Sequence, residues 1–511
     1  MKNIRLIFQS FPDRLDKFLD PITSYRLVLY YLLVIIVWAV VAAVFHKVPF
    51  KWYDLVLSMA WLFLVCRGFN WLASRLLNVP SNKDSDFISA LILALILSPA
   101  ASFRDYLILA LAGAVAMFSK YLLVIGKRHI FNPAALGAFS AGLLFHHYAS
   151  WWVGMAVIIP VVVAGGLLIM RKMKRFTMVL IFLLVYFLII VAKNYTLGAS
   201  PLWQIIWLSI SATPLLFFSY IMLSEPQTSP PDIGKYAPYA ILVAVLYSNL
   251  IFHLTPEAAL LIGNIFAYLM APQKRLELEF IERHKEADGI YSFKFKPSGK
   301  LKFKAGQYME WTIPKAGSDN RGNRRYLTIA SAPSEKELLF TTKMPQKMSS
   351  FKKELMAYET GDEIIASRPS GSFTLPKDIP KKLTFIAGGV GITPFRSIIK
   401  YLIDADIGSS VVLLYAAASA NEFAFKDLFK RADAIGLKTF YTITSDDVPQ
   451  GWHGLAGPID EILIKKVLPD YKDRTFYISG PYGFVQAVRK SLLSLGLKNS
   501  RIKTDYFPGY G

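Results

Sequence analysis

The sequence predicts a helical membrane domain followed by a soluble β-barrel and a doubly wound α/β domain, and three observations support this architecture. Apolar runs with few charges fill residues 27–271, whereas charged residues recur every few positions after Pro272. Short alternating strands follow the apolar part, as in an antiparallel barrel. From Leu383 a repeated strand–helix pattern indicates a parallel sheet covered by helices. We therefore expect three domains, at residues 1–273, 274–380 and 381–511.

Ten apolar segments of the first domain are candidate membrane helices, because a span needs roughly 20 apolar residues. An even number of spans places both termini on one side. Lysine and arginine gather in the loops on the N-terminal side, including the cluster RKMKR. The positive-inside rule then predicts a multi-pass protein of the cell inner or plasma membrane with both termini in the cytoplasm. The segments lie near residues 27–45, 53–73, 87–98, 105–125, 133–147, 151–170, 177–192, 202–223, 236–253 and 256–271.

The membrane part contains a faint internal repeat. The stretch from LILSP to FNPAALGAF resembles the later stretch from IMLSEP to TPEAALLIGNIFA. The offset of roughly 125 residues equals about five helices, so we expect the two copies to be inverted across the membrane. Prolines beside Ser98, Ser224, Asn132 and Thr255 are expected to break helices near the enclosed site. A chance likeness between proline-flanked helices is the alternative.

Composition argues against several kinds of site. The net charge of +21 lies largely in loops beside apolar runs, so we expect a lipid bilayer and no nucleic acid as a partner. The single cysteine, Cys66, excludes an intrachain disulfide and a thiolate-ligated iron–sulfur cluster. The histidines near the apolar runs do not pair on one helix at the spacing of stacked b-haems, so we expect neither haem nor another metal site.

Three motifs of the membrane part resemble signatures of a known family of membrane flavin proteins. They are SALILALILSP, IGKRHIFNPAALGAF and FFSYIMLSEPQTSPP. The family comprises the membrane flavin subunits of the Rnf complex and of sodium-translocating NADH:quinone reductase. The resemblance implies about ten helices in an inverted repeat, a riboflavin, and an FMN attached through phosphate to a threonine on the outer side.

Ser200 is the candidate residue for FMN attachment. It stands at the position of that threonine, in the stretch NYTLGASPLW. Leu197 and Asn194 depart from the family pattern. Serine can form the same phosphoester, and the predicted topology places this loop outside. A plain turn entering a helix is the alternative.

The soluble part resembles the ferredoxin–NADP+ reductase family over about 235 residues. The stretch RRYLTIASAP is similar to the flavin signature of this family. By this resemblance, Arg325 would bridge the FAD pyrophosphate through paired charged hydrogen bonds, and Thr328 would contact the isoalloxazine or the ribityl chain. Strict alignment puts Leu327 at the aromatic position of the signature, unless a local bulge brings in Tyr326.

Further FAD contacts follow from the same resemblance. The stretch QKMSSFKKEL is similar to a helix start at which Ser349 and neighbouring N–H groups hold phosphate. Near the C-terminal end, Phe507 or Tyr506 would cover the flavin, with an apolar tail packed on the barrel as the alternative. The full set of expected FAD contacts is Arg325, Tyr326, Leu327, Thr328, Lys343, Ser349, Ser350 and Phe507.

The stretch GGVGITP resembles the nicotinamide-dinucleotide loop of the same family, and ISGPYGFV resembles its partner loop. Glycines let the backbone approach a pyrophosphate, and the helix that follows aims its N-terminus at the anion. Thr393 near the flavin and Ser479 near the nicotinamide are the catalytic candidates. The expected NAD(P)-binding residues are Gly388, Gly389, Gly391, Thr393, Pro394, Ser479, Gly480, Pro481 and Gly483.

These features predict a membrane-bound, NAD(P)H-dependent flavin oxidoreductase. NADH is favoured, because LYAAASANEF after the second strand has no arginine for a 2′-phosphate. Electrons would pass from cytosolic NADH through FAD to a membrane-domain flavin, then to quinone or an extracytosolic acceptor, with other electron-transport subunits as candidate partners. One alternative is a reductase tethered to a transporter-like or scaffold domain. A haem-dependent ferric reductase is another.

Overall fold

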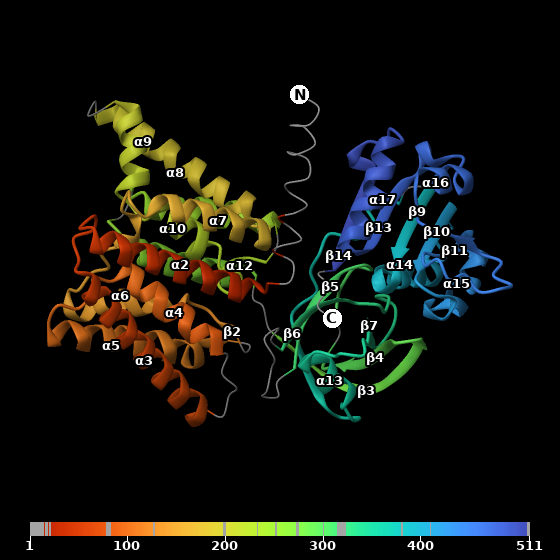
Figure 1. Ribbon diagram of the computed structural model, residues 1–511, viewed down its shortest axis with the longest axis horizontal. Coiled ribbons are helices and arrows are strands. Elements are labelled where there is room, and N and C mark those ends of the chain that lie inside the picture. Colours follow the sequence, from red (N-terminus) through yellow and green to blue (C-terminus); the bar gives the residue numbers. More distant parts are fainter. Residues whose placement is uncertain are drawn as a thin grey trace. The chain divides into compact units, whose positions relative to one another are not determined.

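The chain forms two compact units, residues 1–274 and 275–511. Helices dominate the first unit, and two six-stranded sheets lie in the second (Figure 1). The computed structural model describes residues 15, 19, 22–77, 83–125, 128–197, 201–231, 233–250, 253–271, 275–299, 301–313, 323–379, 382–408 and 410–507.

Each predicted apolar segment of the first unit contains a helix, but fewer than ten helices are long enough to span a membrane. Within the described residues, four meet that test: α2 (Ser24–Val44), α3 (Trp52–Leu76), α5 (Phe103–Leu122) and α8 (Phe176–Leu197). A fifth results if α9 (Leu202–Ser211) and the segment Leu215–Leu223, bent by 65°, form one span. The count of ten spans therefore stays a prediction.

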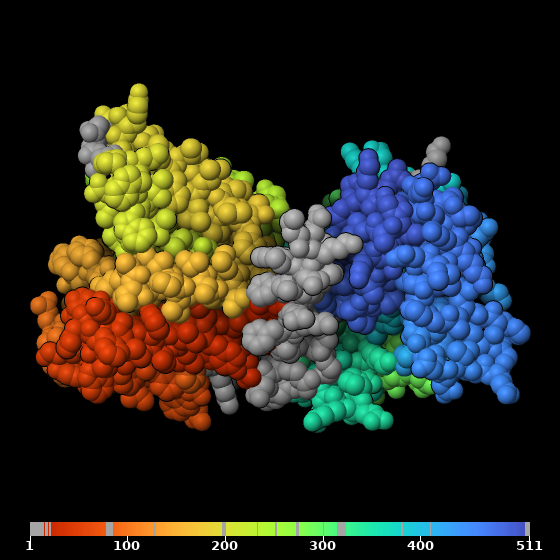
Figure 2. All heavy atoms as spheres, turned by 45° about the horizontal axis from the view of Figure 1, so that its top comes forward, coloured from red at the N-terminus to blue at the C-terminus, as the bar shows by residue number. Residues whose placement is uncertain are grey.

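The remaining helices of this unit are shorter. They are α4 (Lys83–Ile96), α6 (Pro133–Phe145), α7 (Ile159–Met173), α10 (Leu215–Phe217) with the π-helical η2 (Phe218–Leu223), α11 (Tyr236–Tyr247) and α12 (Pro256–Met270). A two-stranded hairpin of β1 (Val124–Ile125) and β2 (Arg128–His129) joins α5 to α6. Buried side chains from most of these helices form one apolar core. The atoms of the unit form one continuous body in the view of Figure 2.

Two of the four prolines named above begin helices instead of breaking them. Asn132 caps α6 and Thr255 caps α12, and each side chain accepts a hydrogen bond from the backbone three residues on. The proline that follows each cap occupies the first helical turn, where its missing N–H group costs nothing. By contrast, α4 ends at Ile96, and Ser98 and the proline after it lie outside the helix.

The same contacts recur in the two halves of the first unit. Helix α5 packs on α6 as α11 packs on α12, and α3 packs on α5 as α8 packs on α11. Helix α2 contacts α4 as α7 contacts α10. The counterparts also meet, since α2 contacts α7 and α6 contacts α12. This correspondence is expected of two copies of one helical motif.

The first sheet of the second unit is antiparallel. Its strands are β3 (Leu276–Ala287), β4 (Ile290–Pro297), β5 (Tyr308–Thr312), β6 (Arg324–Thr328), β7 (Leu338–Lys343) and β8 (Glu363–Ala366), in the order β6-β5-β8-β3-β4-β7. The backbone N–H of Ala330 donates to the carbonyl of Leu339 at 2.7 Å, which joins the two edge strands as in a barrel. Phe295, Trp311 and Phe340 fill the interior, and α13 (Ser350–Met356) packs against it.

The second sheet is parallel and doubly wound. Its strands are β9 (Lys382–Gly388), β10 (Ser410–Ala417), β11 (Leu437–Ile443), β12 (Leu455–Ala456), β13 (Thr475–Pro481) and β14 (Ile502–Phe507), in the order β12-β11-β10-β9-β13-β14. Helices α14 (Thr393–Asp404) and α15 (Lys426–Arg431) pack on one face. Helices α16 (Glu461–Val467) and α17 (Tyr482–Ser494) pack on the other. The strand order reverses at β9, where such sheets bind ligands.

Candidate functional site

Two loops meet at the point where the strand order reverses. Strands β9 and β13 are parallel neighbours, with Ala387 opposite Ser479. Their carboxyl ends therefore release the loops at 388–394 and 479–483 side by side. The sequence predicted both loops as parts of one dinucleotide site, and the sheet brings them together.

The glycines of the first loop differ in what surrounds them. A Cβ on Gly391 would lie 2.3 Å from the carbonyl oxygen of Ser479, and one on Gly388 would lie 2.8 Å from the ring of Phe484. These two glycines permit close packing of the two loops. Gly389 has φ +54°, and a Cβ there would meet no atom within 4 Å. Of these three loop glycines, Gly389 is the one that combines a left-handed backbone with open space around its Cβ position.

The two predicted catalytic side chains are both buried but differ in their bonding. The hydroxyl of Thr393 donates to the carbonyl of Val390 at 3.1 Å and so stabilises the loop. The hydroxyl of Ser479 has no hydrogen-bond partner among the residues that the structure describes. A buried polar atom normally has a partner, so Ser479 is the one that a bound group would satisfy. Pro394 lies in the first turn of α14, while Gly480, Pro481 and Gly483 lie where β13 meets α17.

The register of β5 and β6 decides which aromatic position the flavin signature uses. Leu327 lies opposite Met309 and packs against the barrel core. Tyr326 points to the opposite face, is 60% exposed, and donates from its hydroxyl to Glu310 at 2.7 Å. The ring of Tyr308 lies 5.8 Å away. The pairing is regular, so no bulge is needed for Tyr326 to be the accessible ring.

Thr328 shares the face of Tyr326, because alternate residues of a strand point the same way. Its hydroxyl is buried and lacks a hydrogen-bond partner within the described part of the chain. Arg324 also lies on this face, 3.6 Å from Glu310. Sequence reasoning missed Arg324, since alignment selected the next residue.

Arg325 lies toward α13. It is buried, donates to the carbonyl of Arg324 at 2.7 Å, and places its guanidinium 5.2 Å from the ring centre of Phe351. The hydroxyl of Ser349 caps the seven-residue α13 by accepting from the N–H of Lys352 at 3.4 Å, and Ser350 is the first helical residue. Phosphate contacts by these residues stay predictions.

The other residues predicted to contact FAD or FMN either form a different contact or lie outside the residues that the structure describes. Lys343 forms an ion pair with Glu422 at 2.8 Å, which links β7 to the nucleotide-binding part. The backbone of Phe507 pairs with Pro481, but the side chains of Tyr506 and Phe507 lie outside the described residues. Ser200 also lies outside them.

The barrel and the parallel sheet are joined beside the loops. The phenol of Tyr477 on β13 donates to the carbonyl of Thr374 at 3.2 Å, and Lys503 donates to the same carbonyl at 3.2 Å. Burial raises the pKa of Tyr477 to about 12, so this donor stays protonated near neutral pH. The two halves of the predicted site are therefore parts of one joined structure.

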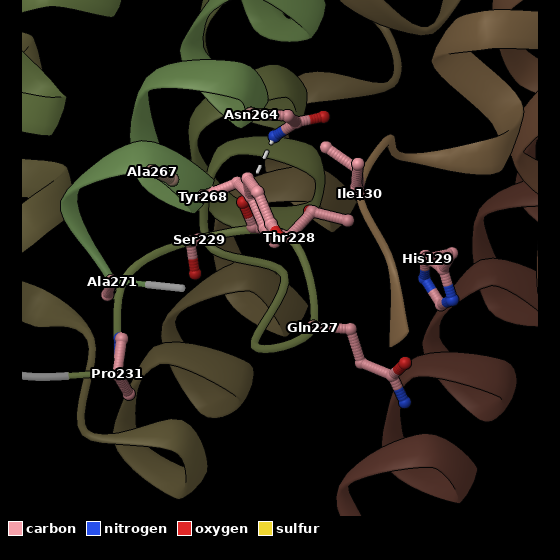
Figure 3. A pocket seen from close by; sticks show the side chains of 10 residues that line it. All are labelled: His129, Ile130, Gln227, Thr228, Ser229, Pro231, Asn264, Ala267, Tyr268 and Ala271. Carbon is pink, nitrogen blue, oxygen red and sulfur yellow. Dashed lines mark hydrogen bonds between the residues drawn. The ribbon is translucent and has the colours of Figure 1, made fainter. Parts of the chain in front are cut away.

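The first unit contains a small cavity of about 20 Å³, room for about one water molecule, lined by polar and apolar side chains (Figure 3). Asn264 of α12 donates to the carbonyl of Thr228 at 3.3 Å, and its Oδ1 accepts from the N–H of Asn132 at 2.9 Å. Asn132 and Thr228 also donate to Glu225, at 2.9 and 2.8 Å. The lining is His129, Ile130, Gln227, Thr228, Ser229, Pro231, Asn264, Ala267, Tyr268 and Ala271.

Comparison with known proteins assigns the second unit. Residues 385–490 match the family model described as oxidoreductase NAD-binding domain. A stachydrine N-demethylase reductase subunit of Rhizobium meliloti (strain 1021) is 29% identical over 241 residues, covering 46% of this chain and 67% of that protein. A flavohemoprotein of Bacillus cereus is 28% identical over 240 residues, covering 44% of this chain and 59% of that protein. The chain thus spans less than two thirds of the flavohemoprotein's length.

Solved structures with similarity include the flavohem-like FAD/NAD binding domain of nitric oxide dioxygenase from Vibrio cholerae O1 biovar El Tor. It is 25% identical with a TM-score of 0.41, over 45% of this chain and 98% of that chain. A ferredoxin NADP+ reductase from Neisseria gonorrhoeae with bound FAD and NADP is 20% identical with a TM-score of 0.40, over 46% of this chain and 98% of that chain. The C-terminal unit of the present chain therefore contains the NAD-binding domain of an oxidoreductase.

Proposed function

We propose that the chain is a membrane-bound NADH oxidoreductase that sends electrons from cytosolic NADH through FAD to a flavin in its helical unit. The final acceptor is quinone or an extracytosolic electron carrier, with other electron-transport subunits as candidate partners. The observation that carries the reductase half is the meeting of the loops after β9 and β13, where the hydroxyl of buried Ser479 has no partner among the described residues.

The residues of the second unit fit FAD on the exposed face of β6. Tyr326 offers an accessible ring, Thr328 offers a buried hydroxyl without a partner among the described residues, and Arg324 supplies a cation on the same face. FAD would supply the conversion from hydride transfer to single-electron release. The protein would orient the ring through Tyr326 and hold a polar edge of the flavin through Thr328.

NADH is the proposed donor, in preference to NADPH. The segment after β10 carries Glu422, whose carboxylate is paired with Lys343 at 2.8 Å. This segment, residues 418–423, has no arginine or lysine. NADP-binding sites of this type use a basic residue at that place. A comparison of kcat/KM for the two nucleotides tests the preference.

The helical unit is proposed to cross the membrane several times, with both termini in the cytoplasm. Four or five sufficiently long apolar helices and the recurring helix contacts support a spanning inverted repeat. A riboflavin in the helical unit is proposed from the family resemblance of its motifs. The cavity of Figure 3, at about 20 Å³, is too small to be its site, because a ligand of that size needs a pocket of about 300 Å³ or more. Ser200 stays the proposed attachment residue for FMN.

A tethered reductase is the second candidate function. In that case the helical unit is a transporter-like or scaffold domain that carries no flavin. The two proposals differ in the flavin content of the purified chain. Electron transfer through the helical unit, here called the relay, requires FAD together with FMN or riboflavin. A reductase that is only tethered to that unit holds FAD alone. The flavin absorbance of the denatured chain gives the total, including any covalently held FMN, and chromatography after acid extraction identifies the flavins that are released. A total of one equivalent, all of it released as FAD, would reject electron transfer through the helical unit.

A further inference from the structure

Helix α14 is tied directly to the segment that leaves β6. Arg396 donates from Nη1 to the carbonyl of Ala330 at 3.0 Å and from Nη2 to Oε1 of Glu335 at 2.9 Å. The hydroxyl of Ser397 donates to the carbonyl of Ser331 at 2.6 Å. These contacts join the helix of the dinucleotide loop to the strand of the flavin signature.

This link lies close in sequence to residues of both the predicted dinucleotide site and the predicted flavin site. Arg396 lies one turn after Thr393 at the start of α14. Ala330 lies two residues after Thr328 at the end of β6. A shift of these contacts would therefore move the dinucleotide loop relative to the proposed flavin face of β6.

In this link the guanidinium of Arg396 pairs with the carboxylate of Glu335, and further contacts hold each partner in place. The side chains of Arg396 and Glu335 are 13% and 26% exposed, and Glu335 faces both terminal nitrogens of the guanidinium. Oε2 of Glu335 also accepts from the N–H of Ala332 at 2.6 Å. The ring of Phe425 lies 5.9 Å from the guanidinium carbon of Arg396. A planar bidentate pair of this kind fixes direction as well as distance, which a lysine cannot reproduce.

We propose that Arg396 is a positioning residue for hydride transfer, which holds the dinucleotide loop in register with the flavin face of β6. This inference rests on the proposed function of the second unit. In the step concerned, a hydride leaves the dihydronicotinamide, which becomes NAD+, and the oxidised isoalloxazine takes up that hydride and is reduced by two electrons. Reacting atoms must approach to about 3–3.5 Å, and a misplacement of about 1 Å costs on the order of a hundredfold in rate.

The test compares Arg396→Lys, Arg396→Met and Glu335→Gln with the unaltered full chain under anaerobic conditions. Stopped-flow absorbance gives the limiting rate of FAD reduction at saturating NADH. We expect that rate to fall by about tenfold to a hundredfold in both Arg396 variants, with FAD content and the NADH concentration for half-saturation little changed. Glu335→Gln should fall less, because glutamine keeps one acceptor for the guanidinium. The long-wavelength charge-transfer absorbance between stacked nicotinamide and flavin should weaken in parallel.

Lys382→Gln is the matched control. Lys382 forms an ion pair with Asp470 at 2.9 Å in the same part of the chain, but at the amino end of β9. This variant should keep the normal limiting rate and charge-transfer absorbance. Chemical reduction by dithionite should be complete in every variant, which shows that the flavin is intact.

The outcomes separate this inference from the function on which it rests. If the unaltered chain binds FAD but NADH does not reduce it, the proposed function fails. If NADH reduces the unaltered chain and the Arg396 variants keep its limiting rate, only the positioning role is overturned. Loss of rate in strict proportion to loss of bound FAD also overturns it. Where Arg396→Met fails to fold, Glu335→Gln and Ser397→Ala supply the comparison.

Discussion

At the scale of single residues, Thr328 offers a direct test of the flavin face. Its buried hydroxyl has no partner within the described residues, so Thr328→Val should not destabilise the flavin-free protein. With FAD bound, the variant loses one hydrogen bond, and the affinity for FAD should fall by about 1 kcal/mol, or roughly fivefold. Titration of the apoprotein, followed by quenching of flavin fluorescence, measures the change.

Thr384→Val supplies the control for that measurement. Thr384 is also buried in the second unit, and its hydroxyl likewise finds no partner in the described part of the chain, but it lies near the start of β9. Valine there should leave FAD affinity unchanged. Equal losses of affinity in both variants would show that Thr328 acts through the fold alone.

The residue scale also shows where sequence reasoning stopped. The motif around Arg325 was recognisable, yet strict alignment favoured Leu327 as the aromatic position and passed over Arg324. Neighbouring residues on a strand point to opposite faces, and the pairing of β5 with β6 determines which face is covered. The exposed Tyr326 beside Tyr308 follows from that register, which the sequence of one strand does not contain.

At the scale of elements, the loop after β9 makes a prediction about two of its glycines. Gly389→Ala meets no atom of the protein, so the variant should fold with a cost of about 1–2 kcal/mol for its left-handed backbone. NADH-driven FAD reduction should nevertheless fall by about a hundredfold, because the new methyl group stands where the dinucleotide backbone approaches. Gly391→Ala should fail differently, by destabilising the unit, because its Cβ would overlap the backbone at Ser479.

Gly496→Ala is the control for the backbone cost. Gly496 has φ +83° and open space around its Cβ position, but it follows α17 instead of the loop. Rapid-mixing kinetics and thermal unfolding on all three variants separate strain from lost binding. Normal FAD reduction in Gly389→Ala would show that this loop serves packing only.

The start of β13 predicts a dependence of stability on acid pH. Arg474 donates to the carbonyls of Leu383 and Ser410 at 3.0 Å each, which joins β13 to β9 and β10. Its Nε donates to Asp470 at 2.7 Å, and this bond, helped by Lys382, lowers the pKa of Asp470 to about 2. A lowered pKa stabilises the fold above the unfolded value of about 4, and this contribution disappears as the pH falls toward 2.

Asp470→Asn should therefore lower the unfolding temperature of the second unit at pH 7. The difference from the unaltered chain should shrink between pH 4 and about 2 and vanish below that range. Thermal unfolding of detergent-solubilised protein, followed by flavin fluorescence across this range, measures it. A difference that stays constant down to pH 2 would assign the effect to packing.

Elements were predictable in proportion to their length and periodicity. The central strands β9, β10 and β13 are continuous apolar runs, as expected of strands buried on both faces, and they were found. β8 and β12, of four and two residues, and the seven-residue α16 were missed, because so few positions cannot establish a period. Strand order was also beyond the sequence, although it creates the site beside β9.

At the scale of the whole molecule, the division into two units follows from composition, but the number of spans does not. Hydropathy located a helix in every apolar segment. It could not distinguish a helix that crosses a membrane from one such as α6, whose thirteen residues include seven that are buried. A span needs about 20 residues, so short buried helices depend on their neighbours for their position.

The relay makes its sharpest prediction at Ser200, which the proposed topology places across the membrane from the FAD unit. An FMN held there by a phosphoester survives denaturation, so the chain should show ultraviolet fluorescence on a denaturing gel when an active flavin transferase is present. Ser200→Ala should lose this band and electron delivery to an extracytosolic acceptor. It should keep NADH oxidation with an artificial acceptor, because FAD chemistry takes place in the other unit.

Thr196 is the matched hydroxyl for this test. It lies in the last turn of α8, where its hydroxyl donates to the carbonyl of Lys193 at 2.8 Å. Thr196→Val should keep the fluorescent band if Ser200 carries the flavin, and should lose it if the attachment lies one turn earlier. Absence of any band in the unaltered chain beside an active transferase would remove covalent FMN from the proposal. Electron transfer across the membrane would then depend on a non-covalent flavin in the helical unit, which acid extraction of the purified chain would release.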